Sequence, residues 1–328
     1  MTDLAPVHGG TDSLPEPRHD FSSNANPLGP CPPVLAAIRR ADVRRYPDPF
    51  YTRLRQRLAV AHDVTAERIV VGAGASELIL RLVRHFDRPV LQLAPTFSEY
   101  ARGAAIARKR VIAPSSPEAF LRAQKRQRSL AFLCCPNNPT GEVWDLEFVA
   151  TAARRGPLVV DLAYASLCGS AQASAIEAAA ADAWRLYSPN KALGLTGVRG
   201  AYLIAPRTAG RVVDEAPSWV IGRDAVAMLE TSLEPAARGW LAESIPKLWR
   251  WRTQLADGLR GLRLTVRESP ATFLLVEVGN GSGVAARLRA AGIRVRDARS
   301  FGLPRWIRLS AQAAPARKAL LAALAASL

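Results

Sequence analysis

The sequence has few of the residues that build metal sites and disulfide frameworks. It contains four cysteines and four histidines, and no two cysteines have the C-x-x-C spacing. Zinc sites and disulfide frameworks depend on clusters of these residues at defined spacings. We therefore expect neither a set of structural disulfides nor a bound metal.

Long apolar runs are also missing. The chain has no stretch of about 18 consecutive apolar residues, the length that spans a bilayer. Its N-terminal residues have neither the basic region nor the apolar region of a signal peptide. We therefore expect a cytoplasmic protein with no membrane partner.

Lysine and acidic residues are scarce beside arginine. Only five of the 44 basic residues are lysines, and the 28 acidic residues leave a net charge of +16. Nucleic-acid-binding surfaces cluster basic residues among aromatic ones. Here arginine is dispersed, and the basic runs 107–110 and 125–128 have no aromatic neighbours. We expect no nucleic-acid partner, and a field that attracts small anions explains the charge more simply.

Apolar residues are plentiful. They make up 49% of the 328 residues, which excludes intrinsic disorder and supports a large core. Residues 1–30 are rich in Pro, Gly, Asn and Ser and predict an irregular arm. Over 31–222 short apolar runs alternate with helical stretches, which indicates an α/β domain with a mostly parallel sheet. Over 223–328 a long helical region precedes a few strands and predicts a smaller α+β domain. The apolar runs that predict strands of the large domain are 68–71, 90–93, 110–113, 130–134, 158–162 and 201–204.

One lysine lies in an unusual context. Lys191 ends Ser188-Pro-Asn-Lys and precedes an apolar, glycine-containing segment that reaches Arg199. Burial would lower the pKa of this amine, and a neutral amine can form a Schiff base. A surface lysine at a helix end is the alternative interpretation.

Three further segments place polar groups where predicted strands end. Asp161 ends one apolar run and is followed by Tyr164, and the turn 135–141 (Cys-Pro-Asn-Asn-Pro-Thr-Gly) follows another. In open α/β sheets, ligands bind at these carboxyl ends. The segment 72–76 (Gly-Ala-Gly-Ala-Ser) joins a strand to a helix, whose first N–H groups can bind a phosphate. The dinucleotide pattern G-x-G-x-x-G is not completed, because position 77 is glutamate.

These four segments, in this order, resemble the fold-type I pyridoxal-phosphate enzymes of the aspartate aminotransferase superfamily. The resemblance covers nearly the whole chain and implies that fold, pyridoxal 5′-phosphate as cofactor, and a homodimer with active sites at its interface. It makes Lys191 the Schiff-base lysine and proton carrier, and it pairs Asp161 with the ring nitrogen. It also implies further cofactor contacts: Ala75, Ser76, Ser188 and Arg199 with the phosphate, Tyr164 and Asn138 with the ring 3′-oxygen, Phe97 stacked on the ring, and Tyr46 with the neighbouring subunit's cofactor phosphate.

The N-terminal residues bear on the reaction. The motif 8–10 (His-Gly-Gly) followed by 20–29 (Asp-Phe-Ser-Ser-Asn-Ala-Asn-Pro-Leu-Gly) is similar to the opening of L-threonine-O-3-phosphate decarboxylases of cobalamin (vitamin B12) biosynthesis. Histidinol-phosphate aminotransferases share the later part. We therefore expect decarboxylation of L-threonine O-3-phosphate to (R)-1-amino-2-propanol O-2-phosphate; the alternative is an aminotransferase acting on histidinol phosphate or a similar amino substrate. The residues that the resemblance assigns to the phosphorylated substrate are His8, Asn26, Arg296 and Arg308.

Two departures from the family pattern stand out. Leu162 follows Asp161 where an acid is usual, and Thr272 stands where asparagine is usual. The pair expected to face the ring, Asp161 and Tyr164, is intact, so we expect activity to survive. A non-enzymatic protein of the same fold is a third hypothesis, which the presence of Lys191, Asp161 and Arg199 disfavours.

Overall fold

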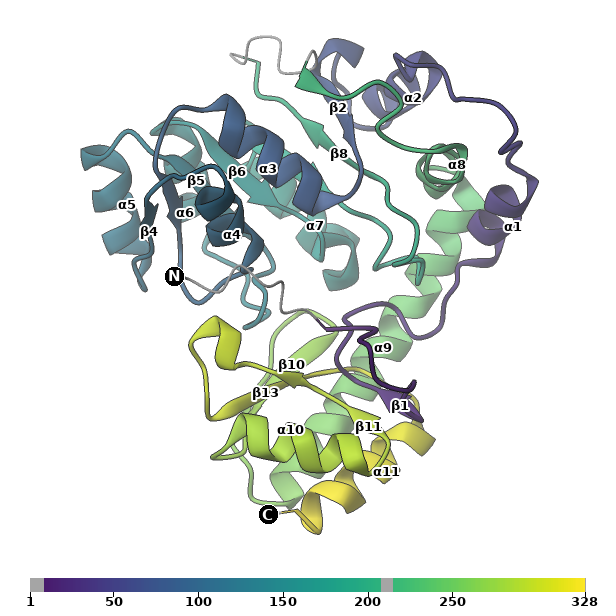
Figure 1. Cartoon of the computed structure of the whole chain (residues 1–328), viewed down its shortest axis with the longest axis vertical. Coiled ribbons are helices and arrows are strands. Elements are labelled where there is room, and N and C mark those ends of the chain that lie inside the picture. The colour runs from purple at the N-terminus through teal and green to yellow at the C-terminus, as the bar shows by residue number, and fades with distance from the viewer. Residues whose placement is uncertain (1–8, 208–214, 328) are drawn as a thin grey trace.

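The computed structural model describes residues 9–207 and 215–327, which form two lobes (Figure 1). The larger lobe is a sheet covered by helices on both faces, and the smaller lobe contains the C-terminal residues. The long helix α9 (Pro235–Gly261) begins beside the large lobe and ends within the small one.

A seven-stranded sheet, in the order β2-β8-β7-β6-β5-β3-β4, forms the centre of the large lobe. Strand β8 is antiparallel to both of its neighbours, and the other pairs are parallel. The sequence pattern does not predict β7, because Arg185 interrupts its apolar run, yet this arginine is buried. The strands are β2 (Ile69–Gly72), β3 (Val90–Gln92), β4 (Val111–Ile112), β5 (Leu130–Cys134), β6 (Leu158–Asp161), β7 (Trp184–Tyr187) and β8 (Ala201–Ile204).

Each face of this sheet has its own apolar layer. Successive residues of a strand point to opposite faces, so Val159 packs with α3 and α4 while Val160 packs with α2, α5, α6 and α7. Helix α6 begins after Asp145, whose side chain accepts the N–H of Phe148 at 2.9 Å. The helices of this lobe are α1 (Pro32–Arg40), α2 (Thr52–Ala61), α3 (Ala75–His85), α4 (Glu99–Ile106), α5 (Pro117–Arg126), α6 (Leu146–Arg154) and α7 (Ser170–Ala179), with α8 (Arg223–Ser232) packed on α1, and the short 3-10 turns η1 (Ala66–Arg68) and η2 (Ala165–Cys168).

The small lobe contains a four-stranded antiparallel sheet in the order β12-β13-β10-β9. Apolar side chains of this sheet pack against α9, α10 and α11. Its elements are β9 (Val266–Arg267), β10 (Phe273–Glu277), α10 (Gly281–Ala290), β11 (Ile293–Arg294), β12 (Arg296–Asp297), the turn η4 (Arg299–Phe301), β13 (Trp306–Ser310) and α11 (Ala314–Ala325).

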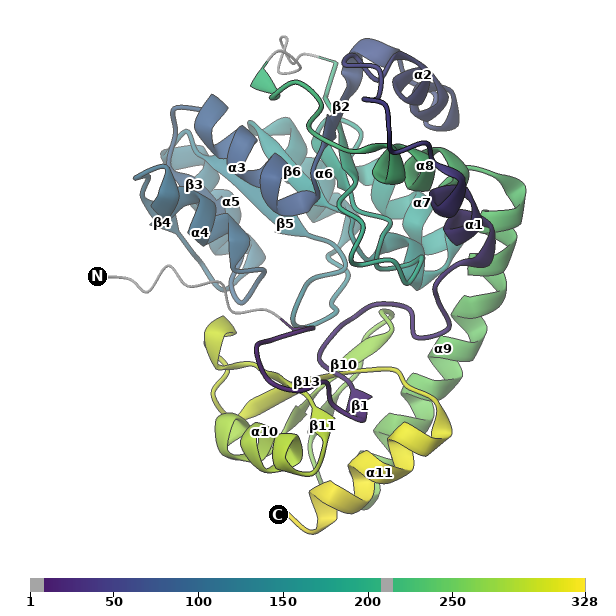
Figure 2. The same ribbon diagram turned by 45° about the vertical axis from the view of Figure 1, so that its right-hand side comes forward.

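The N-terminal arm is held by the small lobe. Strand β1 (His19–Asp20) pairs in parallel with β11, and Phe21 is buried in the core of this lobe. Arg294 of β11 lies 3.1 Å from a carboxylate oxygen of Asp12 and 3.4 Å from one of Asp20. The arm then passes between the lobes to reach α1 (Figure 2). Residues 12–21 and the strand β11 are therefore in contact although they are far apart in the sequence.

The described residues contain neither a membrane-spanning helix nor a cluster of metal ligands. Within 9–207 and 215–327, no helix is long and apolar enough to cross a membrane. The same residues contain no group of three or more His, Cys, Asp or Glu side chains placed to hold a metal ion.

Candidate active site

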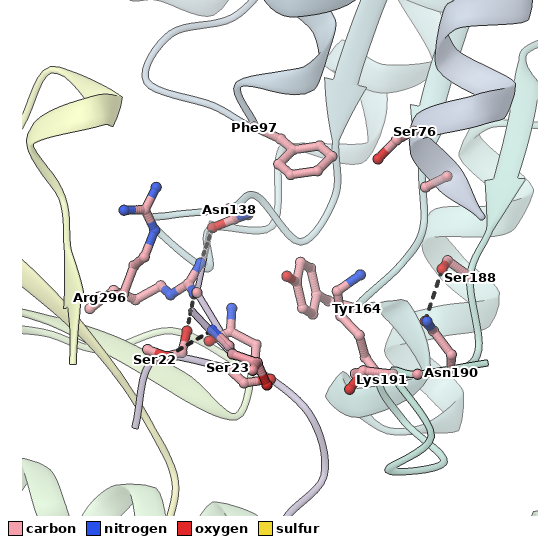
Figure 3. A pocket seen from close by; sticks show the side chains of 18 of the residues that line it. Ser22, Ser23, Ser76, Phe97, Asn138, Tyr164, Ser188, Asn190, Lys191 and Arg296 are labelled. Carbon is pink, nitrogen blue, oxygen red and sulfur yellow. Dashed lines mark hydrogen bonds between the residues drawn. The ribbon is translucent and has the colours of Figure 1, made fainter. Parts of the chain in front are cut away.

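A cavity of about 470 Å³ lies where the parallel strands end, and the arm and the small lobe complete its wall (Figure 3). The segments after β5, β6 and β7 reach it together because the carboxyl ends of parallel strands share one edge of the sheet. Of the site residues predicted from the sequence, the structure brings the following to this cavity: Ala75, Ser76, Phe97, Asn138, Tyr164, Ser188, Lys191, Arg199, Arg296 and Arg308.

The cavity has a cationic cradle at the start of α3. Gly74 has a φ of +91°, a conformation that glycine adopts without strain, and a Cβ at this position would collide with the Arg199 guanidinium. Ala75 and Ser76 form the first turn of the helix, where backbone N–H groups have no partner within the helix. The guanidinium, the helix start and the hydroxyl of Ser76 together suit a phosphate group.

The acidic residue beside the cradle is neutralised. Glu77 forms a two-point ion pair with Arg81, at 2.7 and 2.9 Å, and one of its oxygens accepts the N–H of Ala73 at 3.1 Å. This arrangement holds the turn before α3 in place. It also keeps the carboxylate from repelling an anion bound nearby.

Asp161 ends β6 as a buried carboxyl group. One oxygen accepts a hydrogen bond from the hydroxyl of Tyr100 at 2.8 Å, and the other accepts the N–H of Ala163 at 3.0 Å. Burial raises the pKa of this carboxyl, while the charge of Lys191 and the two hydrogen bonds counteract part of that rise. Asp161 is therefore a preorganised acceptor whose charge depends on its neighbours.

Lys191 enters the cavity on a loop that the N-terminal segment supports. Its Nζ lies 5.2 Å from the centre of the Tyr164 ring, and the two side chains approach each other in Figure 3. Asn26 donates its backbone N–H to the carbonyl of Lys191 at 2.8 Å and its side-chain N–H to the carbonyl of Ala192 at 3.1 Å. Because the side chain of Asn26 is used in this way and does not line the cavity, the structure places it behind the lysine loop rather than at a substrate.

Two buried arginines of the small lobe reach the cavity from the other side. Arg308 donates to the carbonyl oxygen of Ser22 at 2.7 Å and to the side-chain oxygen of Asn138. Arg296 donates to Ser300 Oγ at 2.6 Å. Burial, and then the charge of Arg308, lower the pKa of Arg296 to about 10. Two positive charges held this close favour a shared anionic ligand.

Sequence reasoning missed part of the site. Asn24 lines the cavity, and within the described part of the chain both of its buried side-chain polar atoms lack a hydrogen-bond partner. The sequence feature that could have indicated Asn24 is the N-x-N motif of residues 24–26, from which only Asn26 was predicted. Which of the two asparagines lines the cavity depends on the direction of each side chain. Other lining residues that were not predicted are Gly9, Gly10, Thr11, Ser22, Ser23, Asn190, Thr196, Gly197 and Phe301.

Three predicted site residues that the structure describes, Asp161, Asn26 and Tyr46, do not line the cavity. Tyr46 is 76% exposed and stacks on Trp219, with 4.6 Å between ring centres. It does not line the cavity of its own chain, and its predicted contact with a neighbouring subunit stays a prediction. His8 lies outside the described residues.

Comparison with known proteins gives the family. A model of the family "Aminotransferase class I and II" matches residues 17–326. The chain belongs to this family. The predicted fold-type I architecture is confirmed, and pyridoxal 5′-phosphate is the cofactor that membership implies. The cradle, the buried carboxyl of Asp161 and the lysine in the cavity fit that cofactor.

Individual relatives cover most of the chain. A histidinol-phosphate aminotransferase of Bradyrhizobium diazoefficiens is 31% identical, over 90% of this chain and 89% of its own length. One of Halorubrum lacusprofundi is 32% identical, over 90% and 85%. The structure resembles that of a Sinorhizobium meliloti histidinol-phosphate aminotransferase in complex with pyridoxal 5′-phosphate, with a TM-score of 0.85, 25% identity and coverage of 95% and 91%. An L-threonine-O-3-phosphate decarboxylase of Porphyromonas gingivalis shares the fold, with a TM-score of 0.81, 22% identity and coverage of 93% and 97%.

Proposed function

We propose that this protein is a pyridoxal-phosphate-dependent aminotransferase that acts on histidinol phosphate or a similar phosphorylated amine. The observation that carries the proposal is the presence of two separate cationic regions in one cavity, the cradle at Arg199 and the pair Arg296 and Arg308. One suits the cofactor phosphate and the other the anionic group of a substrate. Curated relatives at about 30% identity that carry this activity support the choice of substrate.

The comparisons favour this activity over the decarboxylation that the N-terminal motif led us to expect. That expectation depended on a short motif in the arm, whereas the similarity to histidinol-phosphate aminotransferases extends over 90% of the chain. The decarboxylase resembles this protein at a level of identity that indicates only a shared fold.

The large lobe would hold the cofactor. Arg199 and the first turn of α3 would bind its phosphate, and the buried carboxylate of Asp161 would meet its ring nitrogen. Asn138 and Tyr164 would donate hydrogen bonds to the ring oxygen, and Phe97 would cover the ring face. Bound in this way, pyridoxal phosphate supplies an electron-accepting ring conjugated to the substrate's amino group.

Lys191 would move the proton. Its amine lies beside the ring of Tyr164, in the cavity that both cationic regions line. An aminotransferase must take a proton from the substrate carbon and return it elsewhere, and a positioned amine can do both. The neutral form of Nζ would accept that proton, and the neighbouring hydroxyl of Tyr164 would orient it.

The small lobe and the arm would select the substrate. Arg308 and Arg296 would bind the phosphate of the amine, because guanidinium groups bind phosphate oxygens at two points. The unpartnered amide of Asn24 would bind a second polar group. Tyr46 would reach the cofactor phosphate of a second subunit, so the active enzyme would be a homodimer.

The direct test supplies the purified chain with pyridoxal phosphate, histidinol phosphate and 2-oxoglutarate. We expect glutamate to form in step with loss of the amine. If no amino transfer occurs to any 2-oxo acid while carbon dioxide is released from threonine phosphate, the proposal is wrong.

One structural observation keeps the decarboxylase as a second candidate. Gly9 and Gly10 of the His-Gly-Gly motif line the cavity, and Gly9 lies against Ser22 and Arg308. Gly9 and Gly10 therefore reach the place where the substrate anion would bind. Aminopropanol phosphate formed from threonine phosphate would favour this candidate.

A further inference from the structure

Tyr100 is a buried tyrosine that contacts the predicted catalytic residue Asp161. It lies on α4, is fully buried, and stacks on Phe132 with 4.7 Å between ring centres. Its hydroxyl donates to Oδ2 of Asp161 at 2.8 Å. Tyr100 does not line the cavity, so it can act on a ligand there only through another residue.

The groups around the carboxyl have opposing effects. Burial favours the neutral acid and raises its pKa, while the charge of Lys191, the Tyr100 hydroxyl and the Ala163 N–H favour the carboxylate. A further titratable neighbour among the described residues is Cys134 on β5, whose thiol donates to the carbonyl of Pro136 at 3.2 Å and is also a hydrogen-bond neighbour of the Tyr100 hydroxyl. Burial raises the pKa of this thiol well above its ordinary value, so Cys134 stays neutral.

The phenol can act only as a donor here. Burial, and then the charge of Asp161, raise the pKa of Tyr100 well above its ordinary value, so the hydroxyl keeps its proton. A hydroxyl that donates to Oδ2, with a backbone N–H on Oδ1, leaves both carboxyl oxygens as acceptors. Both hydrogen bonds are stronger to the carboxylate than to the neutral acid, so they favour the ionised form and oppose the effect of burial.

We propose that Tyr100 is a positioning residue that keeps Asp161 ionised and oriented toward the ring nitrogen of the cofactor. The inference rests on the proposed function, in which that nitrogen meets Asp161. With an ionised partner the ring nitrogen stays protonated and the ring accepts electrons well. With a neutral partner the nitrogen loses its proton and the ring accepts electrons poorly.

The test is Tyr100→Phe, which keeps the ring in the core and removes only the hydroxyl. The control is Tyr202→Phe, which removes another buried hydroxyl, the one that contacts His62 at 2.8 Å. The visible absorption of the bound cofactor is titrated against pH without substrate, and kcat and KM are measured separately.

The sign of the shift follows from charge repulsion. A protonated ring nitrogen repels the proton on the nearby Schiff-base nitrogen and lowers the pH at which that proton leaves. Tyr100→Phe should weaken this repulsion. The midpoint of the pH titration of the cofactor's visible absorption should therefore rise by about one pH unit. It should lower kcat by roughly 10-fold with little change in KM, because one hydrogen bond to a charged group is lost. Tyr202→Phe should leave the midpoint unchanged.

A bound cofactor whose midpoint is the same in Tyr100→Phe and wild type would overturn the inference and leave the proposed function standing. A chain that binds no pyridoxal phosphate would overturn both. If Tyr100→Phe does not fold, the nitrogen resonance of ¹⁵N-labelled cofactor bound to the wild-type protein decides. A protonated ring nitrogen at neutral pH supports the inference, and a neutral one contradicts it.

Discussion

Arg308 of the small lobe donates a hydrogen bond to the side-chain oxygen of Asn138 in the large lobe. The first residue is proposed to bind the substrate anion and the second the cofactor ring. The bond therefore joins the two lobes at the point where substrate and cofactor would meet. The bond uses the amide oxygen of Asn138 and leaves its side-chain N–H groups for the proposed hydrogen bond to the cofactor ring.

This relationship gives the first prediction. Arg308→Lys removes the planar fork and keeps the charge, so we expect KM for the phosphorylated amine to rise about 10- to 100-fold. Cofactor affinity, measured by fluorescence titration, should change less. Arg305→Lys is the matched control, because Arg305 is an exposed residue that pairs with Glu277 at 2.7 Å. Equal effects of the two substitutions would remove the assigned role.

Lys191→Ala should stop turnover. We expect kcat to fall on the order of 1,000-fold, because the proton carrier and the covalent link to the cofactor are both lost. Borohydride reduction followed by mass spectrometry should locate the cofactor on residue 191 in the wild type and find none in the variant. Lys247→Ala and Lys318→Ala, at exposed positions, should behave as wild type.

The phosphate cradle should not tolerate a side chain at Gly74. The positive φ and the collision with Arg199 both oppose alanine, so Gly74→Ala should weaken pyridoxal-phosphate binding by at least about 10-fold. Gly239→Ala is the control, because this helical glycine has open space around its Cβ position. The control should raise the unfolding free energy by up to about 1 kcal/mol. Unchanged cofactor affinity in Gly74→Ala would argue against the cradle.

A buried histidine should make stability depend on pH. Burial, and then the charges of Arg185 and Arg238, lower the pKa of His62 to about 4, below its ordinary 6.5. Between these values the unfolded chain binds a proton that the folded chain does not, so stability is present above pH 6.5 and is lost as pH falls toward 4.

We expect His62→Gln to remove on the order of 2 kcal/mol of this loss. The measurement is the unfolding free energy from urea titrations across that pH range. His85→Gln, at a more exposed histidine, is the control. If the two variants have the same pH profile as wild type, the loss has another cause.

Subunit mixing tests the role of Tyr46. Tyr46→Ala homodimers should bind the cofactor weakly, and Lys191→Ala homodimers should be inactive. In a hybrid, the chain that retains Lys191 would receive the intact Tyr46 of its partner. Mixing the two variants should therefore restore activity, measured after dissociation and reassociation. No recovery in verified hybrids would contradict a site shared between subunits.

The alternation of short apolar runs with helical stretches was sufficient to predict a doubly covered, mostly parallel sheet. Strand β7 escaped prediction because Arg185, a buried charge in its middle, hides the apolar pattern. The N-terminal arm was predicted as irregular, whereas part of it pairs with β11 at the other end of the chain. Pairing between such distant segments leaves no local pattern.

The candidate site was likewise predicted only where its residues belong to a local sequence pattern. The sequence alone indicated Lys191 and Asp161 as candidate site residues, because a lysine near glycines and an acid at the end of an apolar run are local patterns, to which the family resemblance then gave cofactor roles. Only the tertiary structure decided that Asn24 rather than Asn26 lines the cavity, and that Tyr100 donates to Asp161. These depend on side-chain direction and on contacts between residues 61 positions apart. Local propensity fixes neither, because both arise only when the elements pack together.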